Sequence, residues 1–243
     1  MKRRTFITNS VKQAGAITIA PPFIKNLLTD SPNERVNIAV VGISGYRERI
    51  RDMINGRGID HVKYYSKMPN VRITTLCDVD ERLFPGMVSE VEKLAGYTPK
   101  TEWDFRKLLE DPDLDAVSIA TPDHWHALQT VWACQAGKDV LVEKPAHYCV
   151  SEGKKMIDAA RKYNRVVQCA IHPRSSKATQ EGVKFIREGK LGKVYMARGI
   201  VLKYRASIGN VEDSPIPEGV HWDTFLGPAP YRHFNENRYI YTW

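Results

Sequence analysis

Short apolar runs alternate with longer amphipathic stretches through the middle of the chain. Five runs rich in Val, Ile, Leu and Ala predict buried strands, and they cover residues 36–42, 71–77, 115–120, 138–142 and 165–170. Between them, apolar residues recur at helical spacing, most clearly over residues 103–109, 125–136 and 151–163. Strands that alternate with helices predict a parallel, doubly wound α/β sheet.

The pattern changes after residue 170. A helix is predicted over 176–188 and a long strand over 193–202, whereas 204–243 is rich in Pro and aromatic residues and reads as loop. These elements predict the start of an α+β domain with an open antiparallel sheet, with too few strands to complete it. We therefore expect a C-terminally truncated chain with three parts: a leader and linker (1–33), the α/β domain (34–172) and a partial second domain (173–243).

Composition excludes some classes of function. The chain has 243 residues, of which 42% are apolar and 26% charged, as in a globular protein. The net charge of +8 is partly local, and no run of Lys and Arg is interleaved with aromatic residues, so nucleic-acid binding is not indicated. The four cysteines form no Cys-x-x-Cys pair, which indicates neither a disulfide framework nor a metal site.

The first residues have the pattern of an export signal. Arg3 and Arg4 precede a mildly apolar stretch at 14–20, as in twin-arginine signals. This stretch is too short to span a membrane. We expect export to the periplasm or beyond; the alternative is a basic leader on a cytoplasmic protein.

A split glycine loop follows the first strand. A phosphate loop needs glycines there, because backbone N–H groups must reach the phosphates at a helix N-terminus. Removing residues 45–55 joins the two halves into a G-x-x-G-x-G loop, so we expect an eleven-residue insertion inside it. The candidate phosphate-binding residues are Gly42, Ser44, Gly56, Arg57 and Gly58.

Two further strand ends carry polar residues. Asp78 directly follows the second strand, where a carboxylate binds the ribose hydroxyls of NAD and repels the 2′-phosphate of NADP. Asp80 is a competing carboxylate. After the third strand come Thr121 and Pro122, and then His126, which we expect to face the cofactor. The sequence therefore predicts a Rossmann-type domain that binds NAD, with NADP less favoured.

The tripeptide Glu143-Lys144-Pro145 closes the fourth predicted strand. Ligands of open α/β sheets bind at the carboxyl ends of the strands. A lysine at this place, near a cofactor, can take a proton from a substrate hydroxyl. Lys144 is therefore the candidate catalytic residue and also a substrate contact. Glu143 would orient Lys144 or close the strand beside the cofactor.

Together, the glycine loop with Asp78, Thr121-Pro122 and Glu143-Lys144-Pro145 resemble the Gfo/Idh/MocA family of glucose-fructose oxidoreductases and inositol dehydrogenases. Further strings typical of the family cover 159–163, 189–194 and 222–230. The resemblance implies a nucleotide-binding domain followed by an antiparallel sheet domain, which would make 173–243 a partial substrate and oligomerisation domain. It also implies NAD(P)-linked redox chemistry on sugars or polyols, homo-oligomers, and Lys144 at the catalytic site. Two features depart from the family: the insertion, and the lack of a Gly-x-x-His-x-x-Asp-like segment.

The leading interpretation is an NAD-dependent dehydrogenase acting on a sugar or polyol, with Lys144 as proton acceptor. His172 and Arg174, after the fifth predicted strand, are candidate substrate contacts. One alternative is a glycosidase of the same family that holds NAD tightly and shows no net redox change. Another is a fragment without activity.

Overall fold

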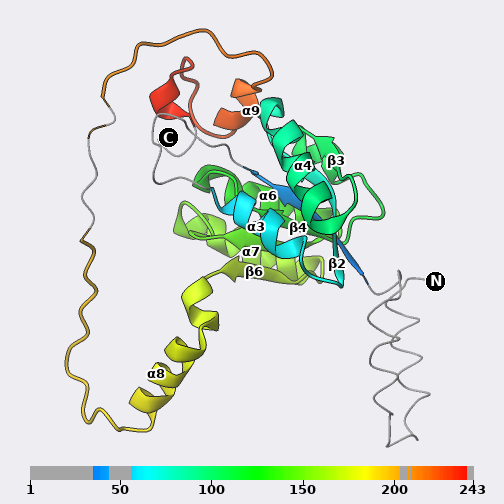
Figure 1. The fold of residues 1–243 in the computed structure, drawn as a ribbon. Helices are drawn as coiled ribbons and strands as arrows, with labels where there is room; N and C mark the ends of the chain where they lie inside the picture. The colour runs from blue at the N-terminus through cyan, green and yellow to red at the C-terminus, as the bar shows by residue number, and fades with distance from the viewer. Residues whose placement is uncertain (1–34, 44–55, 203–206, 208, 240–243) are drawn as a thin grey trace, which may run out of the picture.

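A computed structural model describes residues 35–43, 56–202, 207 and 209–239. Its central element is a six-stranded sheet in the order β3-β2-β1-β4-β5-β6, and every pair is parallel (Figure 1). The strands are β1 (Val36–Val41), β2 (Val71–Cys77), β3 (Lys100–Glu102), β4 (Ala116–Ile119), β5 (Asp139–Glu143) and β6 (Val167–Ala170). The five strands predicted from the apolar runs are confirmed. The edge strand β3 was not predicted, because three polar residues give no periodic signal.

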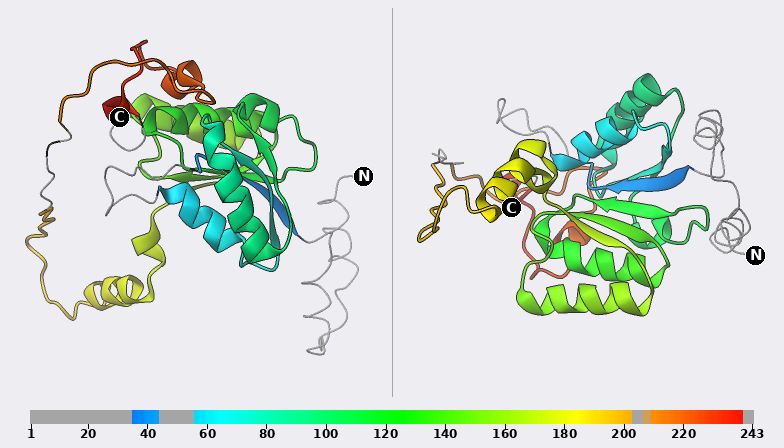
Figure 2. Two further views of the ribbon diagram at one scale, coloured as in Figure 1. Left: turned by 45° about the horizontal axis from the view of Figure 1, so that its top comes forward. Right: turned by 90° about the horizontal axis from the view of Figure 1, so that it is seen from below.

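Helices connect the strands and cover both faces of the sheet. Those before residue 171 are α3 (Arg57–Tyr65), the 3-10 turn η1 (Glu81–Leu83), α4 (Phe84–Ala95), α5 (Phe105–Leu108), α6 (Asp123–Gln135) and α7 (Val150–Lys162). Helices α3 and α4 lie on one face and α6 and α7 on the other (Figure 2). Two apolar clusters fill the two interfaces, one around Val40, Ile73 and Leu76, the other around Val117 and Val142. This arrangement is the predicted doubly wound Rossmann-type fold.

The strand order creates a crevice between β1 and β4. Chain connections run from β1 outward to β2 and β3 in one direction, and from β4 to β5 and β6 in the other. The loops after β1 and β4 therefore diverge, and ligands of such sheets bind outside the carboxyl ends at this point. Because all six strands are parallel, the residues that follow β1, β2, β4 and β5 meet at the same edge.

The chain leaves this body after β6. The 3-10 turn η2 (His172–Ser175) leads into α8 (Lys177–Arg187), which projects away from the sheet (Figure 1). The strand predicted over 193–202 is wrong, since these residues form no strand and are exposed throughout. A strand needs a neighbour to satisfy its backbone hydrogen bonds, and the described residues supply none beside this run. The second, antiparallel sheet domain and the boundaries at 33/34 and 172/173 stay predictions.

Residues 219–239 return to the α/β body. This segment, called the return segment below, contains α9 (Trp222–Leu226) and the 3-10 turn η3 (Glu236–Arg238). Its backbone pairs with the loop after β2: the His221 amide donates to the Val79 carbonyl at 2.8 Å, and the Glu81 amide donates to the Gly219 carbonyl at 2.9 Å. A small apolar cluster led by Trp222 closes over Val79. The return segment thus lies at the carboxyl edge of the sheet.

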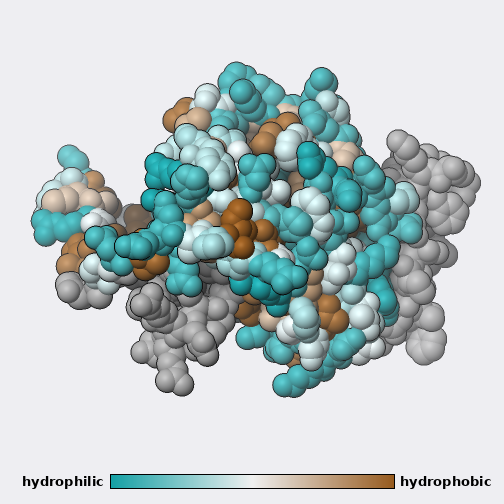
Figure 3. Space-filling model, turned by 90° about the horizontal axis from the view of Figure 1, so that it is seen from above, coloured by the Kyte–Doolittle hydropathy of each residue, from teal (hydrophilic) through white to brown (hydrophobic). Residues whose placement is uncertain are grey.

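The surface seen from above in Figure 3 is mostly hydrophilic, with separate hydrophobic patches. Among the described residues, no helix has both the length and the apolar composition that crossing a membrane requires.

Candidate active site

A cavity of about 740 Å³ opens at the carboxyl edge of the sheet. Its volume is in the usual range for small-molecule and cofactor sites, roughly 300–1,000 Å³. It is lined by nine of the residues singled out in the sequence: Gly42, Gly56, Arg57, Asp78, Thr121, Pro122, His126, Glu143 and Lys144. Ser44 lies outside the described residues. The roles of these residues stay predictions, but the fold brings them to one cavity.

The glycines of the split loop pack against one another. Gly42 has φ +79°, a left-handed conformation that favours glycine. A Cβ on Gly42 would lie 2.7 Å from the Thr121 nitrogen, and a Cβ on Gly58 would lie 1.9 Å from the Gly42 carbonyl oxygen. Helix α3 begins at Arg57, directly after Gly56. The expected insertion at 45–55 lies outside the described residues and stays a prediction.

Replacing Gly58 with alanine should disrupt the loop glycines Gly42, Gly56 and Gly58, called the glycine cradle below, because Gly58 packs closely on Gly42. The added methyl group would meet the rigid backbone of Gly42, so α3 must move away from β1. We expect the free energy of unfolding to fall by about 1–3 kcal/mol, as overpacking typically costs, and dinucleotide binding to weaken. Urea unfolding and fluorescence titration with NADH measure the two effects. Gly182→Ala within α8 is the matched control, since its added Cβ meets nothing within 4 Å outside the backbone of its own helix. Alanine also favours the helix more than glycine does, so this variant should lower neither the free energy of unfolding nor dinucleotide binding.

Structure separates the two competing carboxylates after β2. Asp80 is buried, with its carboxylate accepting two hydrogen bonds from Arg82 at 2.7 Å and one from the Tyr239 hydroxyl at 2.8 Å. Burial and the charges of Asp80 and Asp78 raise the pKa of Tyr239, so this hydroxyl stays a donor. Asp80 therefore fastens the return segment. Asp78 lines the cavity, and its Oδ1 accepts the Asp80 amide at 3.0 Å.

His126 joins two of the turns that border the cavity. Its Nδ1 lies 2.6 Å from the Pro145 carbonyl oxygen, and its Nε2 lies 2.7 Å from the Thr121 carbonyl oxygen. The ring is almost fully buried, at 1% exposure. Its nitrogens are thus engaged by the protein backbone, although the ring lines the cavity. The Thr121 hydroxyl donates to Gln129 Oε1 at 2.7 Å on the same helix.

Glu143 is a buried anion at the end of β5. Its Oε1 accepts from His61 Nε2 at 3.1 Å and from Arg57 Nε at 3.3 Å, and its Oε2 accepts the Lys144 amide at 3.2 Å. Burial by itself raises the pKa of Glu143, but the hydrogen bonds from His61, Lys144 and Arg57 outweigh it and lower this pKa to about 2. The carboxylate therefore stays charged across the physiological range.

This lowered pKa makes a prediction about acid stability. A carboxylate with a folded-state pKa below its ordinary 4.5 stabilises the folded state fully above that value and loses the effect as the pH falls toward about 2. The contribution is at most roughly 3.5 kcal/mol, at about 1.4 kcal/mol per pKa unit. We expect Glu143→Gln to be less stable than the parent at pH 7, with the difference shrinking between pH 4.5 and 2. Urea unfolding at a series of pH values measures it, and a constant difference would contradict the assignment.

The remaining candidates are Lys144, His172 and Arg174. Lys144 is exposed, directly follows β5 and lines the cavity. His172 hydrogen-bonds to Arg57, and its Nε2 lies 3.8 Å from Glu143 Oε1. Neither His172 nor Arg174 is among the residues that line the cavity, and both are exposed. As substrate contacts they stay predictions.

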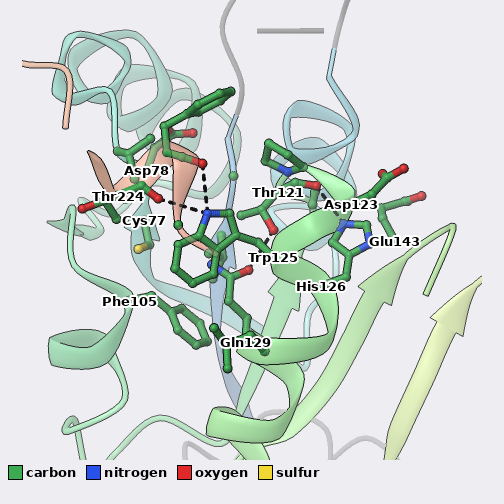
Figure 4. Close-up of a pocket in the computed structure, with 18 of the residues that line it drawn as sticks. Cys77, Asp78, Phe105, Thr121, Asp123, Trp125, His126, Gln129, Glu143 and Thr224 are labelled. Carbon is green, nitrogen blue, oxygen red and sulfur yellow. Dashed lines mark hydrogen bonds between the residues drawn. The ribbon is translucent and has the colours of Figure 1, made fainter. Parts of the chain in front are cut away.

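Several lining residues were not found from the sequence. Figure 4 shows Trp125 between Asp78 and Thr224 on one side and His126 and Glu143 on the other. Its indole Nε1 donates to the Thr224 carbonyl at 3.0 Å and to the Phe225 carbonyl at 3.1 Å. The other new members are aromatic residues after β3 and on α6, and residues of the return segment: Trp103, Phe105, Trp132, Asp223, Gly227, Pro228 and Tyr239.

The tight contact of Trp125 with the return segment explains a glycine. A Cβ on Gly227 would lie 2.2 Å from the Trp125 ring. Residues 222–230 were recognised in the sequence as a string typical of the family. Their contact with Trp125 was not predicted, because it joins residues about a hundred positions apart.

Known proteins share this fold and sequence pattern. The model of an oxidoreductase family with an NAD-binding Rossmann fold, GFO_IDH_MocA, matches residues 36–171, more than half of the chain. Levoglucosan dehydrogenase of Pseudarthrobacter phenanthrenivorans is 35% identical over 119 residues, which are 49% of this chain and 30% of the relative. D-glucoside 3-dehydrogenase of Escherichia coli is 25% identical over 182 residues, which are 74% of this chain and 46% of the relative.

A solved structure agrees with the curated relatives. Levoglucosan dehydrogenase in complex with NADH and levoglucosan superposes with a TM-score of 0.53 at 28% identity, over 65% of this chain and 41% of that one. The chain spans less than half the length of each of these relatives. The family model, the strand order and the glycine cradle agree, and the chain belongs to the Gfo/Idh/MocA family of oxidoreductases with an NAD-binding Rossmann fold.

Proposed function

We propose that the protein is an NAD-dependent dehydrogenase that oxidises a hydroxyl group of a sugar or polyol. The observation that carries the proposal is that one cavity brings together the glycine cradle, Asp78 and Lys144. The names of the two dehydrogenases described above support a carbohydrate substrate. We therefore propose that the cavity binds a small carbohydrate or polyol substrate. We also expect the full gene product to form homo-oligomers, whose mass light scattering measures.

The residues present fit a dinucleotide. Gly42 and Gly58 leave no room for side chains between β1 and α3, so backbone N–H groups at the α3 N-terminus border the cavity without a Cβ in front of them. Gly56 and Arg57 would hold the pyrophosphate at this end, and Asp78 the adenine-side ribose. Thr121, Pro122 and His126 form the facing wall after β4. NADP fits less well, because Asp78 would repel its 2′-phosphate.

The chemistry divides between the cofactor and Lys144. Bound NAD⁺ supplies a hydride acceptor. Lys144 Nζ would take the proton of the substrate hydroxyl as general base, which typically contributes about 10²–10⁴-fold in rate. Glu143 stays ionised and holds the Lys144 backbone amide. His172 and Arg174 are proposed to approach the substrate from the turn after β6.

A substrate panel tests the proposal. The full gene product is incubated with NAD⁺ and a set of sugars, anhydrosugars, glycosides and cyclitols, and NADH formation is followed by absorbance. We expect NADH to accumulate with at least one of them. Release of reducing sugar from a glycoside without NADH accumulation would instead indicate the NAD-recycling glycosidase. Failure to bind NAD or NADH would overturn both.

We also propose export by the twin-arginine route. The support is Arg3-Arg4 with the apolar stretch at 14–20, which lies outside the described residues. Replacing both arginines with lysine should leave the protein in the cytoplasmic fraction, whereas the parent should appear in the periplasmic fraction. Equal distribution of the two forms would contradict the proposal. A cytoplasmic marker enzyme assayed in the same fractions controls for cell lysis.

A further inference from the structure

A chain of hydrogen bonds crosses three elements and ends at Glu143, in the turn that carries Lys144 (residues 143–145, called the catalytic turn below). The Tyr65 hydroxyl lies 3.1 Å from Ser118 Oγ, which lies 2.9 Å from His61 Nδ1. His61 Nε2 lies 3.1 Å from Glu143 Oε1. His61 is 5% exposed, Ser118 0% and Glu143 3%. The chain therefore runs through the interior from α3, across β4, to the end of β5.

The chemistry of Glu143, the last member, sets the direction of the bond that it receives from His61. An ionised carboxylate only accepts, so His61 Nε2 carries the proton and donates to Glu143. When the ring carries this one proton, Nδ1 accepts, so the Ser118 hydroxyl donates to it. Ser118 Oγ in turn accepts from the Tyr65 hydroxyl. All four groups have hydrogen-bond partners in this arrangement, and a fully satisfied buried polar network fixes the geometry of its members.

The carboxylate joins the glycine cradle to Lys144. Arg57 and His61, one helical turn apart on α3, both donate to Glu143 Oε1. The other oxygen, Oε2, accepts the Lys144 amide. Since Gly58 of the same helix packs on Gly42, the helix that begins at the expected pyrophosphate site and the turn that carries the base share one rigid link.

We propose that His61 is a positioning residue for Lys144, acting through Glu143. It holds the carboxylate so that the Lys144 amide, and with it the start of the lysine side chain, keeps a fixed place relative to the glycine cradle. The inference rests on the proposed function in naming Lys144 as the base. The link itself concerns only residues of this chain, so it is measurable without turnover.

The first experiment follows the Lys144 amide by NMR hydrogen exchange. His61→Leu removes the donor to Glu143 at similar volume, and we expect the Lys144 amide to exchange about tenfold faster or more, as the loss of a hydrogen bond to a charged group implies. His61→Gln keeps one donor and one acceptor and should restore exchange to within about threefold. The Val166 amide, which donates to Asp139 at the other edge of the sheet, is the internal reference and should not change.

A control variant distinguishes the positioning role of His61 from a general loss of stability. Tyr97→Phe removes another partly buried hydroxyl, which accepts the Ile73 amide at 2.9 Å far from the catalytic turn. It should leave Lys144 exchange at the parent rate. If His61→Leu does not fold, Ser118→Ala interrupts the same chain one bond earlier, with an expected increase of about threefold. Unchanged Lys144 exchange in a folded His61→Leu or Ser118→Ala variant overturns the proposal.

The second experiment measures turnover once a substrate is known. In His61→Leu we expect kcat to fall about tenfold or more while the dissociation constant of NAD stays within about threefold, and His61→Gln should recover most of kcat. A parallel loss of NAD affinity and stability with unchanged kcat would show a merely structural role and overturn the proposal. If the parent turns over no sugar or polyol, the proposed function fails, whereas the amide experiment still decides the link.

Discussion

Replacing Lys144 with methionine will abolish turnover while leaving NAD affinity nearly unchanged. Methionine keeps the length of the side chain but cannot accept a proton, and the removal of a general base typically costs about 10²–10⁴-fold in kcat. The proposed phosphate contacts at Gly42, Gly56 and Gly58 and the proposed ribose contact at Asp78 do not involve this side chain. The measurement is kcat with the substrate that the panel identifies, together with NADH binding by fluorescence, in the full gene product.

An exposed lysine elsewhere is the control for this result. Lys154→Met on α7 also removes a positive charge. The Lys154 side chain is 78% exposed and forms an ion pair with Asp158, one helical turn away. Such a pair contributes little, so kcat and NAD affinity should both stay at the parent values. Should Lys144→Met retain the full rate of the parent, the proton acceptor is another residue of the cavity. A loss of NAD affinity equal to the loss of kcat would show that Lys144 binds the cofactor instead.

Replacing Asp78 with alanine will weaken NAD binding about ten- to a hundredfold and relax discrimination against NADP. A hydrogen bond to a charged group is worth about 1.5–3 kcal/mol, and removal of the carboxylate also removes its repulsion of a 2′-phosphate. Dissociation constants for NAD and NADP, measured side by side in the parent and in Asp78→Ala, give the ratio of the two affinities in each protein. Tighter binding of NADP than of NAD by the unmodified protein would refute the assignment.

The neighbouring carboxylate provides the contrasting variant. Asp80→Asn loses the ion pair with Arg82 and weakens the acceptor for Tyr239, so it should lower the thermal stability. Because Asp80 is buried under the return segment, its replacement should not change the ratio of NAD to NADP affinity. The two variants together test whether the structure has separated a binding carboxylate from a structural one.

The sequence by itself determined five of the six strands, in their order along the chain, and the edge of the sheet at which the candidate residues meet. Four of the five apolar runs end in, or directly before, a residue of chemical interest: Gly42, Asp78, Thr121 and Glu143. In a parallel sheet built from βα units, every strand presents its carboxyl end to the same edge. Position along the chain is then enough to bring these residues together, with no knowledge of individual contacts.

Only the tertiary structure decided which contacts each residue makes. Asp78 and Asp80 are equivalent by position, and a tyrosine 159 residues further along distinguishes them. His61 meets Glu143 across 82 residues, and the run at 193–202 has the composition of a strand but forms none. Strand pairing, burial and hydrogen bonds between distant segments depend on how the whole chain packs. Each of these interactions joins residues far apart in the sequence, and local periodicity carries no information about such pairs.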